Sequence, residues 1–356
     1  MSVMSAAAFD RHELVTFHTD DTTGLRAIIA VHNSTLGPAV GGCRMFPYAS
    51  DSDALHDVLR LSRGMTYKSA LAGLPLGGGK SVIIGDPHRD KTPELMRAMG
   101  DFVNSLGGRY IAAEDSGTGV DDIRTMRERT PWVNGMDDSE HGGDPSPSTA
   151  LGVYLAIRTA ISHRLGNPDT EGLRVAIQGL GHVGYFLARY LVADGAIVYG
   201  ADVNRANLQR AVDELGVIPV DSNDILRLEV DIVAPCAMGA VWNDRSIAEL
   251  RAGIVCGAAN NQLATERDAG LLQDRGVLYC PDFLVNAGGI IDVHHQRCGS
   301  DTETRRAHID RIQASLSEVL TRADNQRQQT HAIAEELAQE ILDEAKSLQS
   351  PMRVAS

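Results

Sequence analysis

Short apolar runs alternate with amphipathic segments along the first third of the chain. Apolar runs of strand length predict β-strands at residues 25–31, 81–84 and 109–113. Apolar side chains at helical spacing predict helices at residues 52–65 and 93–106. Asp51 or Ser52 is the candidate N-cap of the first helix and Thr92 that of the second, because short polar side chains accept hydrogen bonds from free N–H groups. This alternation predicts an α/β domain over residues 1–134.

A second alternating region follows residues 135–147, a stretch rich in Gly, Asp, Ser and Pro that we interpret as a linker. A long helix is predicted at residues 149–164. Strands are predicted at residues 173–178, 196–201, 217–220, 231–236, 253–256 and 277–280, and helices at 185–192 and 205–215. Strands that alternate with helices favour a parallel, doubly wound sheet over residues 148–328. An apolar stripe within residues 332–347 predicts a final helix in the segment 329–356.

The segment Gly179-Leu180-Gly181-His182-Val183-Gly184 lies between a predicted strand and a predicted helix. In this context three glycines are typical of a dinucleotide-binding turn: Gly179 permits the tight turn, Gly181 lets a pyrophosphate approach the backbone, and Gly184 lets helix pack on strand. The N-terminus of the helix offers N–H groups to the phosphates. Asp202, which ends the next strand, would bind the adenosine ribose and repel a 2′-phosphate. The turn therefore predicts NAD, rather than NADP, as the cofactor.

Two lysines mark the first domain. Lys68 and Lys80 lie twelve positions apart, and three glycines directly precede Lys80. Glycines let a substrate or another chain segment approach closely. Burial and a second lysine nearby both lower a lysine pKa, so one lysine could act as acid and base near neutral pH while the other binds a carboxylate. Taken alone, the segment is as compatible with a glycine-rich turn that carries a surface lysine as with a lysine that acts as acid and base.

Composition narrows the class of protein. The chain has 356 residues, enough for two domains, and 43% of them are hydrophobic. A formal net charge of −14 argues against a nucleic-acid partner. No apolar run reaches the roughly 18 residues of a membrane span, and residues 1–10 lack the basic and apolar regions of a signal peptide. The five cysteines are scattered without a CxxC pair, which favours free thiols and a cytoplasmic location.

Eight motifs, in order along the chain, resemble the amino acid dehydrogenases of the glutamate/leucine/phenylalanine/valine superfamily. The leucine, phenylalanine and valine dehydrogenase branch fits best, and within it leucine dehydrogenase. The motifs lie at residues 36–44, 65–80, 114–118, 144–147, 179–184, 234–237, 258–263 and 286–289. The resemblance implies an N-terminal α/β substrate domain, a Rossmann NAD-binding domain, and a C-terminal helix that returns to the first domain. It also implies a homo-oligomer, a dimer or larger.

The resemblance also implies roles for residues within these motifs. Lys80 and Asp115 would be catalytic, with Lys80 activating water and Asp115 handling the protons of the amino group. Substrate binding would involve Lys68, Gly41, Gly42, Met65, Asn261, Val40, Ala113, Ile290 and Val293. Cofactor binding would involve Gly179, Gly181, His182, Val183, Gly184, Asp202, Thr149, Cys236, Ala237, Ala258, Asn260 and Asn286.

Simpler structural interpretations exist for some of these residues. Asp115 could be the N-cap of a helix that starts near Val120, and Thr149 could cap the helix that follows it. Asn261 could be a turn residue with left-handed backbone.

Some positions depart from the family pattern. Asp144 stands where the family usually has Asn. Asp292 and the pair His294-His295 follow the Asn-Ala-Gly-Gly motif where other polar or small residues are usual. Adjacent residues on a helix point about 100° apart, so the two histidines cannot both face one metal ion. Since HExxH and CxxC are also missing from the sequence, we expect no metal site.

The resemblance, together with the dinucleotide turn, implies an NAD-dependent L-amino acid dehydrogenase that releases a 2-oxo acid and ammonia. Such a substrate requires a fixed cation, a fixed anion and a lysine that can lose its proton. By resemblance, Val40, Ala113, Ile290 and Val293 surround the substrate side chain. All four are apolar, so a buried γ-carboxylate would lack a cation, whereas the glutamate branch supplies a lysine near position 40. We therefore expect leucine, valine or isoleucine as the substrate.

Other functions remain as alternatives. Phenylalanine or tryptophan dehydrogenase is the alternative within the branch, although the side-chain bulk of Ala113 and Ile290 favours a narrower pocket. A noncatalytic NAD-sensing protein is the alternative from another class, but it would not need Lys68, Lys80 and Asp115. A 2-hydroxy acid dehydrogenase would need a His–acid pair and a carboxylate-binding arginine, which the sequence does not offer convincingly.

Overall fold

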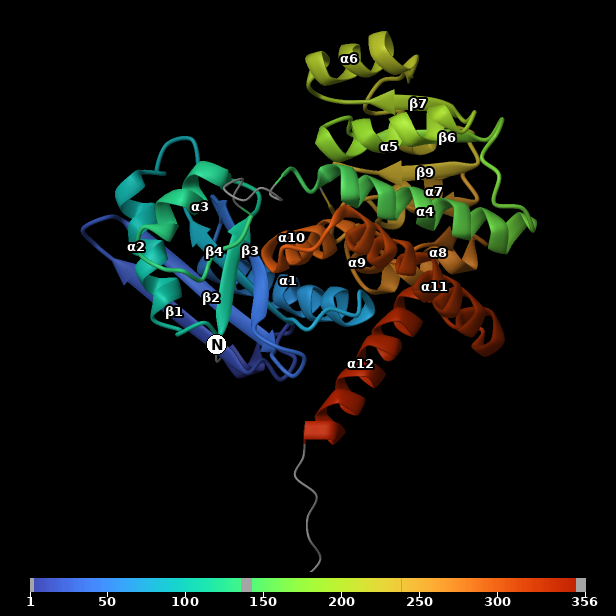
Figure 1. Cartoon of the computed structure of the whole chain (residues 1–356). Helices are drawn as coiled ribbons and strands as arrows, with labels where there is room; N and C mark the ends of the chain where they lie inside the picture. Colours follow the sequence, from blue (N-terminus) through green and yellow to red (C-terminus); the bar gives the residue numbers. More distant parts are fainter. Residues whose placement is uncertain (1–2, 136–142, 238, 350–356) are drawn as a thin grey trace, which may run out of the picture. The chain divides into compact units, whose positions relative to one another are not determined.

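The computed structural model describes residues 3–135, 143–237 and 239–349, and the chain divides into two compact units (Figure 1). Of the described residues, the first unit contains those up to Gly143, residues 296–299 and those from Ala338 onward. The second unit contains residues 144–295 and 300–337. Most of the predicted linker, residues 136–142, lies outside the described residues. The predicted fold class, two α/β domains of which one has a parallel sheet, is confirmed.

The first unit is built on a mixed sheet of five strands in the order β1-β2-β4-β3-β5. The strands are β1 (Leu14–Asp20), β2 (Leu25–Asn33), β3 (Ala39–Phe46), β4 (Gly77–Ile84) and β5 (Tyr110–Glu114). β1 and β4 pair with β2 in antiparallel fashion, and β3 pairs in parallel with both β4 and β5. A 3-10 turn, η1 (Val3–Ser5), precedes the sheet. Sequence reasoning did not identify β1 and β3 as strands.

Helices cover both faces of this sheet, as Figure 1 shows: α1 (Asp51–Leu71) on one side, α2 (Pro93–Asn104) and α3 (Val120–Arg127) on the other. Alternate residues of a strand point to opposite faces. Accordingly Ile28 and Val82 pack on α1, whereas Ile29 and Ile83 pack on the side of α2 and α3.

α1 is longer than predicted and starts one residue earlier. Its N-cap is Ser50, whose hydroxyl accepts a hydrogen bond from the Asp53 N–H, so the prediction of Asp51 or Ser52 as cap is wrong. The helix continues past residue 65 to Leu71 because the segment contains no proline or helix-stopping polar cluster.

The glycine run before Lys80 is a buried strand, so the interpretation as a turn with a surface lysine is wrong. A Cβ atom on Gly77 would stand 2.3 Å from the Asn33 carbonyl oxygen, and one on Gly78 would stand 2.0 Å from the Thr66 nitrogen. Close backbone approach from two sides therefore requires glycine here.

The second unit is built on a parallel sheet of six strands in the order β11-β10-β9-β6-β7-β8. The strands are β6 (Arg174–Gln178), β7 (Ile197–Ala201), β8 (Ile218–Pro219), β9 (Ile232–Pro235), β10 (Ile254–Val255) and β11 (Leu278–Tyr279). Figure 1 shows β9, β6 and β7 side by side. The chain leaves β6 towards β8 and then returns to β9 on the other side of β6. This reversal is the switch point at which open α/β sheets bind ligands.

The helical elements of the second unit are α4 (Ser146–Leu165), α5 (His182–Ala193), α6 (Arg205–Leu215), η2 (Ile225–Arg227), α7 (Asp244–Glu249), α8 (Arg267–Asp274), α9 (Asp282–Val285), α10 (Gly288–Cys298), α11 (Thr302–Gln326) and the start of α12 (Thr330–Gln349). Trp242, which is fully buried, centres a core with Ile247 of α7 and Leu272 of α8. α4 packs on α5 and on α11. α12 ends in the first unit, where the Gln349 side chain donates a 2.8 Å hydrogen bond to the Thr35 carbonyl oxygen.

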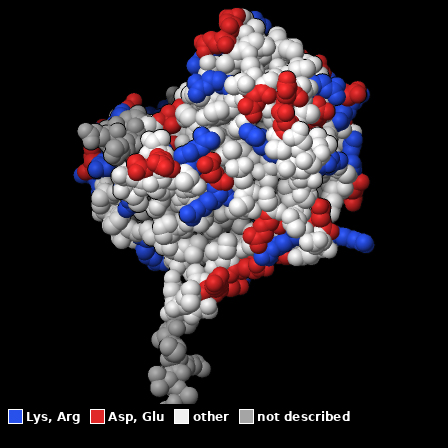
Figure 2. Space-filling model, turned by 45° about the vertical axis from the view of Figure 1, so that its right-hand side comes forward, with Lys and Arg blue, Asp and Glu red and all other residues white. Residues whose placement is uncertain are grey.

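Charges are mixed on the surface. On the face that Figure 2 shows, acidic and basic side chains are interspersed. Within the described ranges, no helix is long and apolar enough to cross a membrane.

Two histidines are buried together beneath α1. His12 and His32 are 8% and 6% exposed, and their rings meet edge to face with centroids 4.8 Å apart. His32 shares a 2.9 Å hydrogen bond with the Thr66 hydroxyl. Burial, and then the proximity of His12, lower the pKa of His32 to about 4, although Asp10 acts in the opposite direction.

This histidine pair predicts loss of stability in acid. An unfolded histidine titrates near 6.5, so between pH 6.5 and about 4 the unfolded state binds more protons than the folded state. The free energy of unfolding should therefore fall as pH falls through this window, by up to a few kcal/mol at about 1.4 kcal/mol per pKa unit. Thermal unfolding followed from pH 7 to 4 should show a falling Tm, with a weaker slope in His32→Asn. His56→Gln, on the exposed side of α1, should keep the wild-type slope. Equal slopes in the wild type and His32→Asn would contradict this account.

Candidate active site

Lys80 and Asp115 meet across a strand. Lys80 lies on β4 and Asp115 directly follows β5, and these two strands flank β3. Lys80 has the same parity along β4 as Val82, so its side chain lies on the face that α1 covers. From there the Lys80 ammonium reaches over β3 and forms an ion pair with the Asp115 carboxylate. The Lys80 and Asp115 side chains are only 7% and 14% exposed, so the structure brings the two predicted catalytic residues together in a buried pair.

Gly42 makes this contact possible. It lies on β3 between the two partners, opposite Ala113 of β5. A Cβ atom on Gly42 would stand 2.7 Å from both the Cβ and an Oδ atom of Asp115, and 2.8 Å from the Glu114 carbonyl oxygen. Any side chain at this position would therefore push Asp115 away from Lys80. Gly41 is similarly restricted, since its Cβ would stand 1.7 Å from the Gly79 carbonyl oxygen.

The electrostatics favour a deprotonatable Lys80. Burial lowers the pKa of Lys80 to about 7, and the positive charges of Arg44 and Lys68 add to the effect. Asp57 acts in the opposite direction. An ionised Asp115 in contact with the ammonium also opposes the shift, so the pair holds the lysine near the point where it can take or give a proton.

Arg44 joins two carboxylates beside this pair. On β3 it lies two residues after Gly42 and therefore on the same face. Its Nη1 donates to Asp57 at 2.9 Å, and its Nε and Nη2 lie 3.4 Å from one oxygen of Asp115. The Tyr48 hydroxyl donates to the same Asp57 oxygen at 2.6 Å. Sequence reasoning assigned no role to Arg44, Asp57 or Tyr48. The position of Arg44 two residues after Gly42 was the available signal.

The loop after β5 is fixed by its own hydrogen bonds. The Thr118 hydroxyl donates to the Cys43 carbonyl oxygen at 2.6 Å, and the Asp115 N–H donates to that hydroxyl at 3.1 Å. The N-cap of α3 is Gly119, so the interpretation of Asp115 as an N-cap is wrong.

Other predicted substrate residues lie in the same unit. Met65 and Lys68 are half-buried on α1, the helix that covers the Lys80 face. Val40 and Ala113 have the parity of Gly42 and Ile111 on their strands, which places them on that face as well. The other two residues predicted to surround the substrate side chain, Ile290 and Val293, are half-buried on α10 of the second unit.

The glycine turn has the geometry of a phosphate site. Gly179 follows β6 with φ +91°, a left-handed backbone that favours glycine. A Cβ on Gly184 would stand 1.9 Å from the Gly179 carbonyl oxygen, so helix and turn pack without a side chain between them. The N-cap of α5 is Gly181, which offers no side-chain cap, and a Cβ there would meet no described atom within 4 Å. The first turn of α5 therefore leaves room for a phosphate group.

Asp202 closes the turn from the end of β7. One of its oxygens accepts a 2.7 Å hydrogen bond from the Leu180 N–H and the other accepts one from the Asn204 N–H. The carboxylate is thus fixed at the carboxyl edge of the sheet. Two buried side-chain oxygens at this edge, Gln178 Oε1 and Asn286 Oδ1, have no hydrogen-bond partner among the described residues. These features fit the dinucleotide that the sequence predicts.

The remaining predicted cofactor residues also lie in loops at this edge. The Asn286 amide donates to the Ala258 carbonyl at 3.0 Å and to the Asn260 side chain at 2.7 Å. Asn261 has left-handed backbone, φ 51°, and its carbonyl accepts from Ala240, which agrees with a turn residue. Cys236 and Ala237 follow β9.

Thr149 lies near the start of α4, where Gly288 and Gly289 at the start of α10 pack against it. The N-cap of α4 is Pro145, so the interpretation of Thr149 as a cap is wrong. Its hydroxyl donates to the Pro145 carbonyl at 3.1 Å. A Cβ on Gly289 would stand 2.5 Å from that hydroxyl, so the Asn-Ala-Gly-Gly segment packs directly on this turn.

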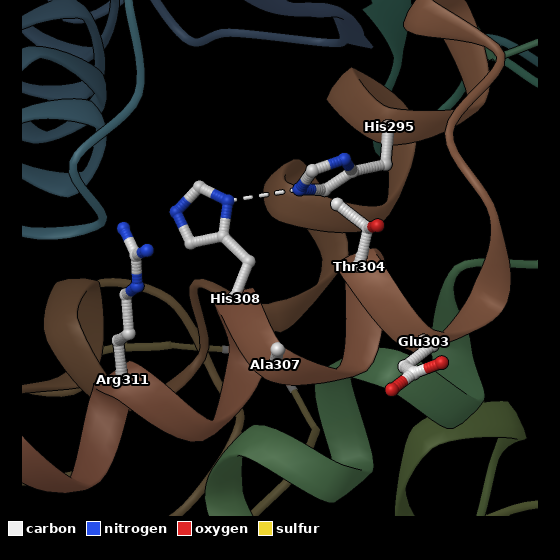
Figure 3. A pocket seen from close by; sticks show the side chains of 6 residues that line it. All are labelled: His295, Glu303, Thr304, Ala307, His308 and Arg311. Carbon is white, nitrogen blue, oxygen red and sulfur yellow. Dashed lines mark hydrogen bonds between the residues drawn. The ribbon is translucent and has the colours of Figure 1, made fainter.

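The residues that depart from the family pattern contact the glycine turn, one another or α11. Asp144 lies 3.6 Å from His182 of the glycine turn, and both are exposed. Asp292 is buried and forms a 2.8 Å ion pair with Arg305. Figure 3 shows the 2.9 Å contact between His295 and His308, with Glu303 turned away from both. Burial, and then His308, lower the pKa of His295. In the described part of the chain, no group of three or more His, Cys, Asp or Glu side chains is placed to hold a metal ion.

The chain is similar to known proteins over most of its length. Residues 11–132 match the family model described as Glu/Leu/Phe/Val dehydrogenase, dimerisation domain, and residues 202–355 match that described as Glutamate/Leucine/Phenylalanine/Valine dehydrogenase. The chain is 44% identical to leucine dehydrogenase of Geobacillus stearothermophilus over 96% of its length and 93% of the relative's. It is 46% identical to phenylalanine dehydrogenase of Bacillus thermotolerans over 88% of its length and 84% of the relative's.

A solved structure also matches. The structure of L-tryptophan dehydrogenase from Nostoc punctiforme superposes with a TM-score of 0.81 and 40% sequence identity, over 95% of this chain and 97% of that one.

The role of Gly42 can be tested with one methyl group. Gly42→Ala should lower turnover on the order of 10²-fold, because the new Cβ displaces Asp115 from Lys80. Gly64→Ala is the matched control: Gly64 lies within α1, and its Cβ would meet no described atom within 4 Å. That variant should keep its activity and gain up to about 1 kcal/mol of stability from the better helix former. Equal activity of both variants would show that the lysine–aspartate contact does not matter for turnover.

Proposed function

Because the chain belongs to the glutamate/leucine/phenylalanine/valine dehydrogenase family, we propose that it catalyses the reversible, NAD-dependent oxidative deamination of an apolar L-amino acid. The products are the 2-oxo acid, ammonium, NADH and a proton, and one water molecule is consumed. The observation that carries this proposal is the buried ion pair of Lys80 and Asp115, with the pKa of Lys80 lowered to about 7.

Three charged residues of the first unit, Lys68, Asp115 and Lys80, have a part in the proposed reaction. Lys68 holds the substrate α-carboxylate as a fixed cation. Asp115 accepts a proton from the substrate ammonium group, which frees the nitrogen lone pair as hydride leaves Cα. Neutral Lys80 then takes a proton from the water that adds to the imine carbon, and returns it to the departing amine. A lysine with the pKa of a solvated side chain would be protonated at neutral pH and would be a poor base.

The second unit holds the nicotinamide cofactor, which when bound accepts hydride from Cα. The first turn of α5 binds the pyrophosphate, and Asp202 binds the adenosine ribose. NAD is the form we propose, because Asp202 would repel the 2′-phosphate of NADP. The next two residues, Val203 and Asn204, are uncharged and supply no cation for that phosphate, and Arg205 is an exposed residue at the start of α6.

The substrate side chain is aliphatic, that of leucine, valine or isoleucine. Val40, Ala113, Ile290 and Val293 are the residues proposed to surround it, and none of them could pair with a γ-carboxylate. The similarity to leucine dehydrogenases over nearly the whole chain supports this choice. Since phenylalanine and tryptophan dehydrogenases are also similar, an aromatic substrate is the second candidate.

The assembly is a homo-oligomer in the cytoplasm. The first family model is described as a dimerisation domain, and β1 is an edge strand with Phe17 53% exposed. The five cysteines, all within the described residues, form no disulfide, which fits a reducing compartment.

Replacement of the proposed base gives the most direct test. Lys80→Ala should lower kcat on the order of 10²–10⁴-fold, the usual contribution of general acid–base catalysis. NAD binding, measured by calorimetry, should persist because the glycine turn lies in the other unit. Near-normal turnover would remove Lys80 from the mechanism.

A panel of amino acids tests the substrate and the cofactor. With NAD, kcat/KM should be highest for leucine, valine or isoleucine and lowest for glutamate, and NADP should be a poorer cofactor with every substrate. One methylene group is worth about 1–3 kcal/mol in an apolar pocket, so aliphatic substrates should differ among themselves by about 10–200-fold. Phenylalanine or tryptophan as the best substrate would overturn the pocket assignment, and no reduction of NAD with any amino acid would overturn the function.

A further inference from the structure

The Lys80–Asp115 pair is part of a larger buried group of charges. Arg44 faces the pair from β3, and Asp57 and Lys68 face it from α1, whereas the Cys43 side chain lies on the opposite face of β3. Burial raises the pKa of the Cys43 thiol to about 11, so it is neutral. Lys80 is therefore balanced between two cations, Arg44 and Lys68, and two carboxylates.

Arg44 contacts both carboxylates of this group, Asp57 and Asp115. Its side chain is 19% exposed, and those of Asp57 and Asp115 are 25% and 14% exposed. The planar guanidinium uses Nη1 for Asp57 and its Nε and Nη2 for Asp115. A lysine ammonium lacks this planar set of separate N–H donors, so it could not contact both carboxylates in the same way.

Tyr48 anchors the far side of this arrangement. Its hydroxyl donates to the Asp57 oxygen that also accepts from Arg44. Burial, and then the contact with Asp57, raise the pKa of Tyr48, so it remains a neutral donor. Asp57 thus accepts hydrogen bonds from both Tyr48 and Arg44, and it holds Arg44 from the side opposite Asp115.

We propose that Arg44, anchored by Asp57 and Tyr48, is a positioning residue that holds the Asp115 carboxylate beside Lys80 and sets the charge balance around that lysine. The inference rests on the proposed roles of Lys80 and Asp115. It adds that the acid–base behaviour of Lys80 depends on a residue that touches neither substrate nor cofactor.

The charges give opposite signs for two substitutions. Arg44→Gln removes a cation and leaves both carboxylates uncompensated, so the pKa of Lys80 should rise. Asp57→Asn removes a carboxylate but keeps an oxygen that can accept from Arg44, so the pKa of Lys80 should fall. General disruption of the fold would not produce shifts in opposite directions.

The test is the pH profile of kcat/KM for oxidative deamination, whose acid limb reports the loss of the Lys80 proton. The limb should move up by about one pH unit in Arg44→Gln and down by a similar amount in Asp57→Asn. Arg44→Lys should keep the limb near that of the wild type but lower kcat, because it restores the charge without the fork. Arg26→Gln is the control: Arg26 pairs with Asp51 on the surface of the same unit, and both are more than half exposed.

A second readout does not need turnover. Reductive methylation of Lys80 with formaldehyde and cyanoborohydride, quantified by mass spectrometry across pH, measures the titration of its amine directly. It should show the same opposite shifts, even in a variant that has lost activity. Shifts in the same direction, or no shift in Arg44→Gln, would overturn the inference, while the amino acid panel would decide the proposed function separately.

Discussion

A lysine ammonium that reaches across one strand to a carboxylate is the contact on which the first unit depends. β4 and β5 both pair with β3, so Lys80 and Asp115 are separated by a full strand and can meet only if nothing rises from β3 between them. Gly42 satisfies this requirement. α1 covers the same face and removes water from the pair, which lowers the pKa of Lys80. Strand order, one missing side chain and one covering helix therefore combine to bury Lys80 beside a carboxylate and to lower its pKa.

Burying charge in this way is costly unless every charge has a partner. The first unit meets the condition with a chain of contacts that runs from Tyr48 through Asp57 and Arg44 to Asp115 and Lys80. Because the partners come from β3, α1 and the loop after β5, the charges also join separate elements of the unit. The arrangement that lowers the pKa of Lys80 thereby restricts the geometry around it.

The candidate site of the second unit is formed mainly by backbone. It consists of a left-handed glycine after β6, a helix N-terminus without a side-chain cap, and the Asp202 carboxylate at the end of β7, which accepts a hydrogen bond from the turn itself. Parallel strands bring these parts to one edge of the sheet at the switch point beside β6. The loops after β9, β10 and β11 end at the same edge, where Asn286 links two of them. Side chains mainly fix the loops, and the N–H groups in the first turn of α5 are the groups proposed to bind a phosphate.

The sequence by itself determined the fold class, and it singled out the glycine turn with Asp202 and the residues Lys68, Lys80 and Asp115 as candidates for the chemistry. These conclusions rest on local spacing, such as glycines after a strand or apolar positions at helical intervals, and on motifs short enough to read along the chain. The tertiary structure alone decided that the glycine run is a buried strand, that Lys80 pairs with Asp115 over Gly42, and that Arg44 and Asp57 belong to the site. Strand order β4-β3-β5 makes neighbours of residues that are far apart along the chain, and burial then sets their charges. Neither the strand order nor the burial of these residues can be obtained from local spacing, because both depend on which strands pair and which helix covers them.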